Sequence, residues 1–296
     1  MASAHDDSIV RAEQVLTSED ERYAAVHLNE TNETKESAVV EIRRWIEESD
    51  NLRVRTDDFF ILRFLRTCKF NVEKTKMRMQ NYYKQRSDLP EWFMNKDPFQ
   101  SELQELLNMG LFLPLRKRDN QGRVVIIIRG TRHDPRIHKI SDICKIGVLA
   151  TEMATKNYNA ISVYGIALFI DVANPTMRHA VQMRPHVIMN LVHCWQSSYP
   201  IRVSVLNIIN APEYVNVVLK IFRSFMNEKM KSRLNVYTQK TMQDCFKDIP
   251  VNILPVEYGG TDGTLQELTE YWKNLIEENR DWLISDENDQ LIVSKQ

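Results

Sequence analysis

Three histidines recur at seven-residue intervals, and imidazole is the side chain that most often binds a metal ion or moves a proton near neutral pH. They are His179, His186 and His193. If all three lay on one helix, neighbouring rings would be about 10.5 Å apart along the axis, whereas metal–nitrogen bonds are close to about 2 Å. One ion could not reach all three. We therefore expect polar-face or packing roles for these histidines and predict no metal site.

The other reactive side chains also lack partners at useful spacing. His133 and His138 have no suitable acid or cysteine nearby in sequence, and Asp171 precedes Asn174-Pro175, a setting typical of a turn or a helix cap. The four cysteines, Cys68, Cys144, Cys194 and Cys245, are scattered without a CxxC pair. Cys144 and Cys194 stand next to apolar residues and fit small buried hydrophobic residues. No phosphate-binding glycine loop or nucleophile-elbow motif occurs. We predict no catalytic residues, no cofactor and no enzymatic activity.

The composition is that of an ordinary soluble protein. Of 296 residues, 43% are hydrophobic and 27% charged, and the formal net charge of −1 argues against a general nucleic-acid binder. The apolar run Val124–Ile128 is far too short to span a membrane. The segment Met1–Asp7 lacks the basic and apolar regions of a signal peptide. With its scattered cysteines, the chain is expected to be cytoplasmic.

The first third of the chain has helical periodicity. Residues 1–33 are polar and acidic, and we expect a mobile or loosely docked arm. Residues 34–95 contain three helical segments, the second starting after the capping sequence Thr56-Asp57-Asp58 and the third, Val72–Arg86, capped by Asn71. They predict a small N-terminal helical bundle.

Residues 96–262 alternate between strand and helix patterns. Apolar strands are predicted at Arg123–Arg129, Gly165–Asp171 and Val203–Ile209, with helices at Ser141–Asn157 and Arg184–Ser197 between them. This order predicts an α/β domain with a mainly parallel sheet. Residues 263–296 are expected to form a C-terminal helix and tail.

The segment Glu213–Leu234 is the most distinctive. It predicts one long helix with an apolar surface wider than a half-buried helix needs, followed by a basic end with Lys229, Lys231 and Arg233. Two interpretations are open at this point. The segment is either an ordinary core helix whose C-terminal dipole is balanced by cations, or a helix that covers an apolar cavity and meets an anionic surface. Methionines are frequent in the same region, which fits either an irregular core or an adaptable cavity.

Several motifs occur together in the order and spacing of a known family. They are Phe60-Ile61-Leu62-Arg63-Phe64-Leu65-Arg66, Asn81-Tyr82-Tyr83, Tyr199-Pro200-Ile201-Arg202, Asn207-Ile208-Ile209-Asn210-Ala211-Pro212 and Leu254-Pro255-Val256-Glu257-Tyr258-Gly259-Gly260. On these motifs the chain resembles the CRAL-TRIO lipid-transfer family over roughly residues 35–285. The resemblance implies an α/β cage, with a sheet floor and a mobile helical lid, that encloses one hydrophobic molecule.

The resemblance also assigns roles to individual residues. The implied lipid pocket comprises Cys144, Thr151, Ile166, Ile170, Met177, Met183, Leu191, Cys194, Trp195 and Tyr199. The implied gate helix carries Val217, Val218, Ile221, Phe222 and Phe225. A basic cleft of the tocopherol-transfer branch, which binds phosphatidylinositol bisphosphate, corresponds to Lys69, Arg202, Lys229 and Arg233.

These assignments lead to a functional hypothesis. We expect a carrier that shields one lipid-like molecule and exchanges it at phosphoinositide membranes, with which it associates peripherally. The cargo is open among tocopherol-, retinoid-, carotenoid-, sterol- and phospholipid-like molecules, because several implied pocket residues differ from their tocopherol-binding counterparts. The alternative is a trafficking adaptor that binds phosphoinositides and transports no cargo. No nucleic-acid partner is expected.

Overall fold

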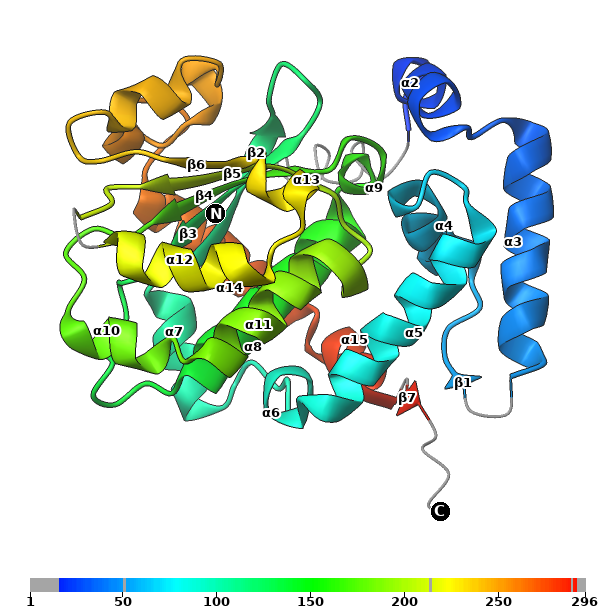
Figure 1. Cartoon of the computed structure of the whole chain (residues 1–296), viewed down its shortest axis with the longest axis horizontal. Helices are drawn as coiled ribbons and strands as arrows, with labels where there is room; N and C mark the ends of the chain where they lie inside the picture. Colours follow the sequence, from blue (N-terminus) through cyan, green and yellow to red (C-terminus); the bar gives the residue numbers. More distant parts are fainter. Residues whose placement is uncertain (1–15, 50–51, 213–214, 289, 292–296) are drawn as a thin grey trace.

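The computed structural model describes residues 16–49, 52–212, 215–288 and 290–291. An α/β body occupies most of the molecule, and helices from the N-terminal part of the chain stand at one side of it (Figure 1). This arrangement confirms the predicted fold class.

The body is built on a five-stranded sheet in the order β2-β3-β4-β5-β6. The strands are β2 (Phe112–Arg118), β3 (Val124–Arg129), β4 (Ile166–Asp171), β5 (Val203–Ile209) and β6 (Leu234–Val236). The β2–β3 pair is antiparallel and the other three pairs are parallel. The prediction of a mainly parallel sheet is therefore confirmed. Strand β2 was not predicted; it contains Pro114 and lies at the sheet edge, where a missing backbone N–H is tolerated.

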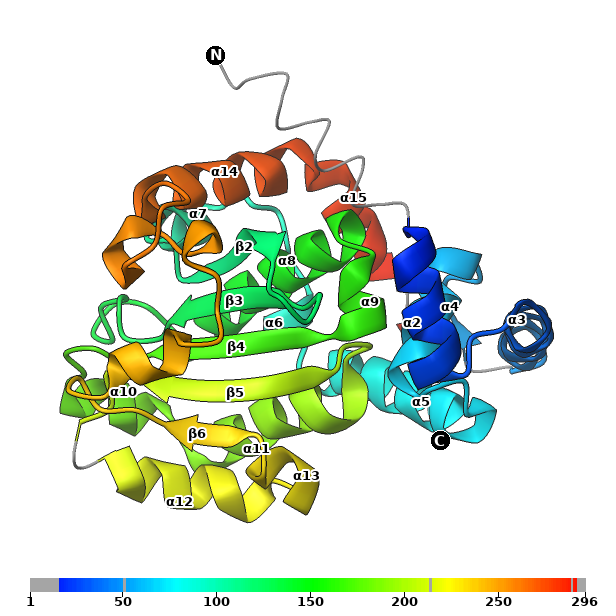
Figure 2. The ribbon, with the colours of Figure 1, turned by 90° about the horizontal axis from the view of Figure 1, so that it is seen from above.

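Alternate residues of the central strand point to opposite faces of the sheet. On one face lie α8 (Ile140–Asn157), α11 (Pro185–His193) and α12 (Val215–Phe225), as Figures 1 and 2 show. On the other face, Phe169 of β4 stacks on Phe246 with ring centroids 5.1 Å apart. Phe246 belongs to a series of short 3-10 turns, η2 (Met242–Phe246), η3 (Val251–Ile253) and η4 (Val256–Tyr258). Covering on both faces explains why β3 and β4 are continuously apolar.

The remaining helices of the body are short or lie at its edge. They are α7 (Ser101–Asn108), α9 (Ala160–Tyr164), α10 (Met177–Gln182) and α14 (Leu265–Glu278). α14 packs beside β2, where the indole N–H of Trp272 donates to the carbonyl of Pro114 at 2.6 Å. The predicted C-terminal helix is thereby confirmed.

Two helices of the N-terminal region begin at the predicted capping residues. It contains α3 (Asn32–Glu47), α4 (Asp58–Thr67), α5 (Val72–Asp88) and α6 (Pro90–Phe93). The side chain of Asp57 accepts the N–H of Phe60 at 3.0 Å, and that of Asn71 accepts the N–H of Lys74 at 2.9 Å. Each bond satisfies one of the free N–H groups of a helix start.

The segment predicted as a mobile or loosely docked arm contains a helix, α2 (Ser18–Leu28). α2 packs on α9 through the rings of Tyr23 and Tyr164, whose centroids are 4.3 Å apart. Its Asp20 accepts a hydrogen bond from Arg118 at 2.9 Å. The part of this arm before residue 16 lies outside the described residues.

The chain after α14 returns to the N-terminal helices. α15 (Arg280–Ser285) and η5 (Asp286–Asn288) lead into β7 (Gln290–Leu291), which pairs antiparallel with β1 (Leu52–Arg53). The predicted C-terminal tail is therefore partly a structural element of the helical region.

The prediction of one helix over Glu213–Leu234 is wrong. The segment forms α12 and a separate α13 (Glu228–Lys231), and Leu234 already belongs to β6. Asn227 interrupts the helix because its side chain caps α13, accepting the N–H of Met230 at 2.8 Å. Residues 213 and 214 lie outside the described part of the chain.

Candidate functional site

A cavity of about 280 Å³ lies between the sheet and the helices on its first face. Ile166, Leu168 and Ile170 of β4 line its floor, and they are alternate residues of one strand. α8 and α11 form walls, and α10 and α12 close the remaining sides. Most lining side chains are aliphatic, aromatic or sulfur-containing, so the cavity suits an apolar molecule.

Most residues assigned to the pocket from sequence lie in this wall. They are Cys144, Thr151, Ile166, Ile170, Met183, Leu191, Cys194, Trp195 and Tyr199. Met177 is the exception and lies outside the wall, with 73% of its surface exposed. It is the first residue of the short helix α10, whose opposite side presents His179 and Ala180 to the cavity.

The thiols in the wall are not reactive groups. Burial raises the pKa of Cys144 far above its usual value and that of Cys194 to about 12. Both side chains therefore remain neutral thiols near neutral pH, as apolar wall residues should.

α12 covers the cavity with part of its apolar surface. Val218 and Phe222 line the cavity, and Phe222 stacks on Trp195 with ring centroids 6.5 Å apart. Three other residues assigned to the gate, Val217, Ile221 and Phe225, are outside the lining set, and Val217 is 69% exposed. The wide apolar surface of this helix thus faces partly the cavity and partly the rest of the core, with Val217 exposed.

The end of α12 is held by one amide side chain. Gln196 donates to the carbonyl of Phe225 at 3.1 Å and accepts the N–H of Asn227 at 3.0 Å. It belongs to a π-helical turn, η1 (Cys194–Ser198), that continues α11. Arg78 of α5 in turn donates to the carbonyls of Gln196 at 2.7 Å and Tyr199 at 2.6 Å. The break between α12 and α13 is therefore tied to the N-terminal helical region.

The four basic residues assigned to the phosphoinositide cleft come from separate parts of the chain. Lys69 lies in the α4–α5 turn, Arg202 precedes β5, Lys229 lies on α13 and Arg233 precedes β6. Arg202 donates to the carbonyls of Arg66, at 2.6 Å, and of Val163, and Arg233 donates to the carbonyl of Val203. Within the described residues, none of the four forms an ion pair with an acid.

These cations are close enough to repel one another. Partial burial lowers the pKa of Lys229, and the positive charges of Arg233, Lys69, Arg202 and Arg78 lower it further. Burial lowers the pKa of Arg202 to about 10, with Arg233 and Arg66 adding repulsion. We call Lys69, Arg78, Arg202, Lys229 and Arg233 the basic cluster. Arg78 is the member that the sequence assignment missed. The mutual repulsion would be relieved by an anion.

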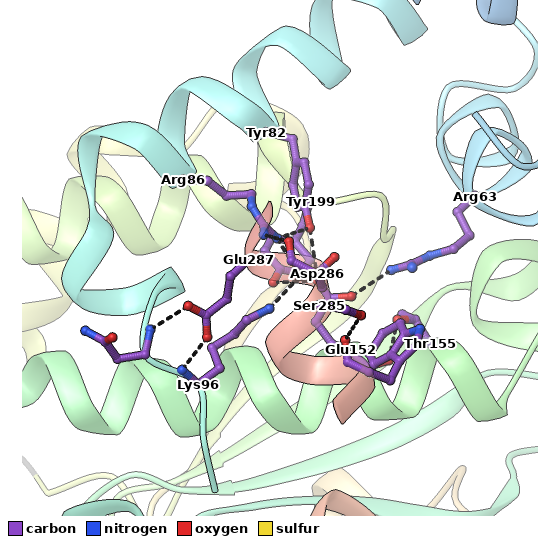
Figure 3. Close-up of polar contacts among 12 residues, drawn as sticks. Arg63, Tyr82, Arg86, Lys96, Glu152, Thr155, Tyr199, Ser285, Asp286 and Glu287 are labelled. Atoms are coloured by element: carbon purple, nitrogen blue, oxygen red, sulfur yellow. Dashed lines mark hydrogen bonds and ion pairs between the residues drawn. The ribbon is translucent and has the colours of Figure 1, made fainter. Parts of the chain in front are cut away.

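A buried polar network includes the cavity-lining residue Tyr199 (Figure 3). Glu152 of α8 is 2% exposed and accepts hydrogen bonds from the hydroxyls of Tyr82 at 3.1 Å and Tyr199 at 3.0 Å. Arg63 lies 3.7 Å from the same carboxylate. Burial raises the pKa of both tyrosines, so they remain hydroxyl donors. Tyr199 thus links the cavity wall to α4 and α5.

The network continues into the C-terminal segment. The carboxylate of Asp286 accepts hydrogen bonds from Arg86 at 2.9 Å and Lys96 at 2.5 Å, and all three residues are buried. Burial alone would raise the pKa of Asp286, but Arg86 and Lys96 outweigh it and lower the pKa to about 2. Local sequence patterns gave no signal for this contact.

The histidines of the seven-residue repeat occupy two helices, His179 on α10 and His186 and His193 on α11. No three His, Cys, Asp or Glu side chains of the described residues are placed to hold a metal ion. Asp171 acts as a turn residue and accepts the N–H of Ala173 at 3.0 Å. No helix in the described part of the chain is both long and apolar enough to cross a membrane.

Comparison with known proteins defines the class. The CRAL/TRIO domain model matches residues 108–260, more than half of the 296 residues, and the Pinta-like, UBA domain model matches residues 31–103. The chain therefore belongs to the CRAL/TRIO family, as its sequence motifs indicated.

Individual relatives share 26–30% of their residues with this chain over the matched length. The alpha-tocopherol transfer protein-like protein of Mus musculus is 30% identical over 214 residues, which cover 72% of this chain and 61% of that protein. Its Homo sapiens counterpart is 29% identical over 222 residues, covering 75% and 64%. This chain thus spans less than two thirds of the length of these relatives. Clavesin-2 of Mus musculus is 26% identical over 238 residues, covering 80% and 72%. The crystal structure of Sfh5 has the same fold, with a TM-score of 0.55 and 13% identity over 84% of this chain and 98% of that one.

Proposed function

We propose that this protein is a non-enzymatic carrier that encloses one lipid-like molecule and exchanges it at phosphoinositide-containing membranes. The observation that carries the proposal is that α12 lines the apolar cavity, exposes Val217, and is followed by a short helix with Lys229, one of a group of cations that have no acidic partner among the described residues. Membership of a family whose relatives include proteins named for tocopherol transfer supports a carrier role.

Exchange at a membrane follows from the energetics of the cavity. Each CH₂ group moved from water into an apolar site contributes about 0.8 kcal/mol. A cargo filling the cavity would therefore leave into water extremely slowly. Release requires that the cavity open where the cargo can pass directly into a bilayer.

α12 and its neighbour α10 provide an apolar surface for such contact. Val217 of α12 is 69% exposed, and Met177 and Val181 of α10 are 73% and 66% exposed. These side chains can enter the membrane interface while Ile221, Phe222 and Phe225 follow as the gate opens. Opening at the break after α12 would require release of the two hydrogen bonds from Gln196.

The basic cluster would hold the membrane's anionic lipids. A phosphoinositide headgroup carries several phosphates, and converging lysines and arginines are the side chains that bind them. Near an anionic leaflet each cation contributes about 1 kcal/mol. An anion here would also compete with the carbonyls now bonded to Arg78, which connects headgroup binding to the end of the gate.

The test compares one double variant with one single control variant. Lys229→Ala/Arg233→Ala should weaken binding to phosphatidylcholine vesicles containing phosphatidylinositol bisphosphate by about 2 kcal/mol, or roughly 30-fold. Its transfer of cargo to those vesicles should slow while native mass spectrometry shows unchanged cargo occupancy. Lys231→Ala is the matched control, because Lys231 is on the same short helix but is paired with Glu228 at 2.7 Å. Equal loss of occupancy and transfer in the double variant would refute the gate mechanism.

A phosphoinositide-binding adaptor without cargo is the second candidate, favoured only by the basic cluster. It predicts salt-sensitive vesicle binding by a protein that stays empty after incubation with mixed cellular lipids. Native mass spectrometry followed by organic extraction distinguishes the two, since a carrier retains a stoichiometric apolar molecule.

A further inference from the structure

Side chains that line the cavity form two rows that together cross the whole sheet. In the register of the strands, each member of a row stands directly opposite the next. The first row is Phe112, Ile128, Ile170 and Ile208, and the second is Ile126, Leu168, Leu206 and Leu234. Since neighbouring strands are about 4.8 Å apart, β2 and β6 lie roughly 19 Å from each other. The cavity floor is therefore an apolar trough that runs across the strands.

α12 covers the β6 end of this trough. Its Leu219 packs in one cluster with Ile208 of β5 and Leu234 of β6, and all three residues line the cavity. α8 covers the opposite half and packs beside β2 (Figure 2). A cargo that enters past α12 would therefore advance along the trough toward β2.

Phe112 closes the β2 end of the trough. It lines the cavity and is only partly buried, so its ring has surface that a cargo can touch. The ring reaches from the sheet edge to the backbone of α8, because a Cβ atom on Gly147 would lie 2.9 Å from both Cε1 and Cζ of Phe112. Carbon atoms in contact are normally about 3.5–4.0 Å apart. Glycine at position 147 is therefore what lets the ring lie against the helix.

The space around Phe112 determines where a displaced ring could go. Phe112 also lines a void of about 10 Å³, which it shares with Leu113, Ala150 and Trp272 and which it separates from the cavity. A void of this size holds at most about one water molecule, whereas the cavity has about 280 Å³. A ring pushed away from Gly147 must therefore turn into the cavity and shorten it.

We propose that Phe112, held against Gly147, sets the greatest length of cargo that the protein accepts. The cargo lies across the strands, with one end under α12 and the other against the Phe112 ring. The inference rests on the proposed carrier function and narrows its cargo to elongated apolar molecules shorter than roughly 19 Å.

The experiment measures this length limit with rigid rods. The all-trans diphenylpolyenes lengthen by one vinylene unit at a time, from stilbene through diphenylbutadiene, diphenylhexatriene and diphenyloctatetraene to diphenyldecapentaene. Fluorescence titration reports their uptake by the full chain. The wild type should bind the shorter rods and reject the longest. Phe112→Ala should extend the limit by at least one vinylene unit, because the ring no longer blocks the trough.

Gly147→Ala should shift the limit the other way. The added methyl group displaces the Phe112 ring into the cavity, so the longest rod that the wild type binds should bind at least about fivefold more weakly. Alanine is more favourable than glycine inside a helix, so this variant is expected to fold. A smaller rod should bind as it does to the wild type.

Two further variants separate the length limit from folding. Phe112→Leu keeps an apolar side chain in place and should extend the limit even if Phe112→Ala does not fold. Phe246→Ala deletes a buried ring on the opposite face of the sheet and should leave the limit unchanged.

The outcomes distinguish the length limit from the carrier function. The inference would be overturned by equal limits in the wild type, Phe112→Leu and Gly147→Ala, or by a wild type that binds every rod. A wild type that takes up cellular lipids but no rod would also overturn it while leaving a carrier. A wild type that takes up neither would refute the carrier function itself.

Discussion

Replacing Asp286 with asparagine should destabilise the whole protein, although the residue does not line the cavity. The substitution keeps the shape of the side chain and removes its charge. Arg86 and Lys96, which are 6% and 0% exposed, would then be two buried cations without their shared carboxylate. Removing one partner of a buried ionic group costs roughly 3–5 kcal/mol.

The pKa of Asp286 provides a second value for the same loss. The protein lowers this pKa from 3.8 to about 2, a difference of about 1.8 units. At about 1.36 kcal/mol per unit, the charged form is favoured by about 2 kcal/mol over the neutral form, which asparagine resembles. We therefore expect the free energy of unfolding to fall by about 2–5 kcal/mol.

Urea denaturation followed by tryptophan fluorescence measures this change. The matched control is Asp281→Asn, since the side chain of Asp281 is 98% exposed and 3.6 Å from Arg280. An exposed pair of this kind contributes at most about 1 kcal/mol. A loss below about 1 kcal/mol in Asp286→Asn would refute the reasoning, because it would mean that the two cations find other partners or water.

Three further predictions concern acidity, the gate and the thiols. Because the folded pKa of Asp286 is depressed, its stabilisation is fully present above about pH 4 and is lost as the pH falls through 2, so acid unfolding of Asp286→Asn should lack that component; superimposable pH profiles would contradict this. Gln196→Ala should raise the hydrogen-exchange rate of the Asn227 amide at least tenfold, whereas Ser224→Ala, on the exposed side of α12, should not. Equal exchange rates in the two variants would show that Gln196 does not hold the break between α12 and α13. Iodoacetamide at neutral pH should modify half-buried Cys68 well before Cys194, whose pKa is raised to about 12, as peptide mass spectrometry would show; equal rates would mean that the cavity is open to solvent.

Local signals in the sequence located several of the long helices and the strands β3, β4 and β5. The caps at Asp57 and Asn71 fixed two helix starts, and continuous apolar runs marked β3 and β4. The break at Asn227 was missed because apolar residues continue through Met226 to Met230 at helical spacing. Asparagine is a favoured N-cap, so the signal was present but was outweighed by the periodicity.

The residues of the candidate site were harder to predict from local sequence patterns. Its pocket and cleft residues were assigned from a family resemblance, since side chains that meet in space are far apart in sequence. His133 and His179 are 46 residues apart, and the sequence offered no reason to pair them. Arg78 lies in the middle of a regular helix, where a basic side chain is expected at the surface, so its contacts with η1 could not be foreseen.

The pairing of α5 with the C-terminal segment has a consequence for synthesis of the chain. Arg86 is synthesised 200 residues before Asp286, the acid with which it pairs. At about 5–20 residues per second, the ribosome needs roughly 10–40 s to reach it. Until then burial of Arg86 and Lys96 is unfavourable, so the N-terminal helices of a nascent chain must stay partly solvated around α5 and α6. We therefore expect the helical region that comes first in the sequence to be among the last parts of the molecule to close, together with the β1–β7 pair.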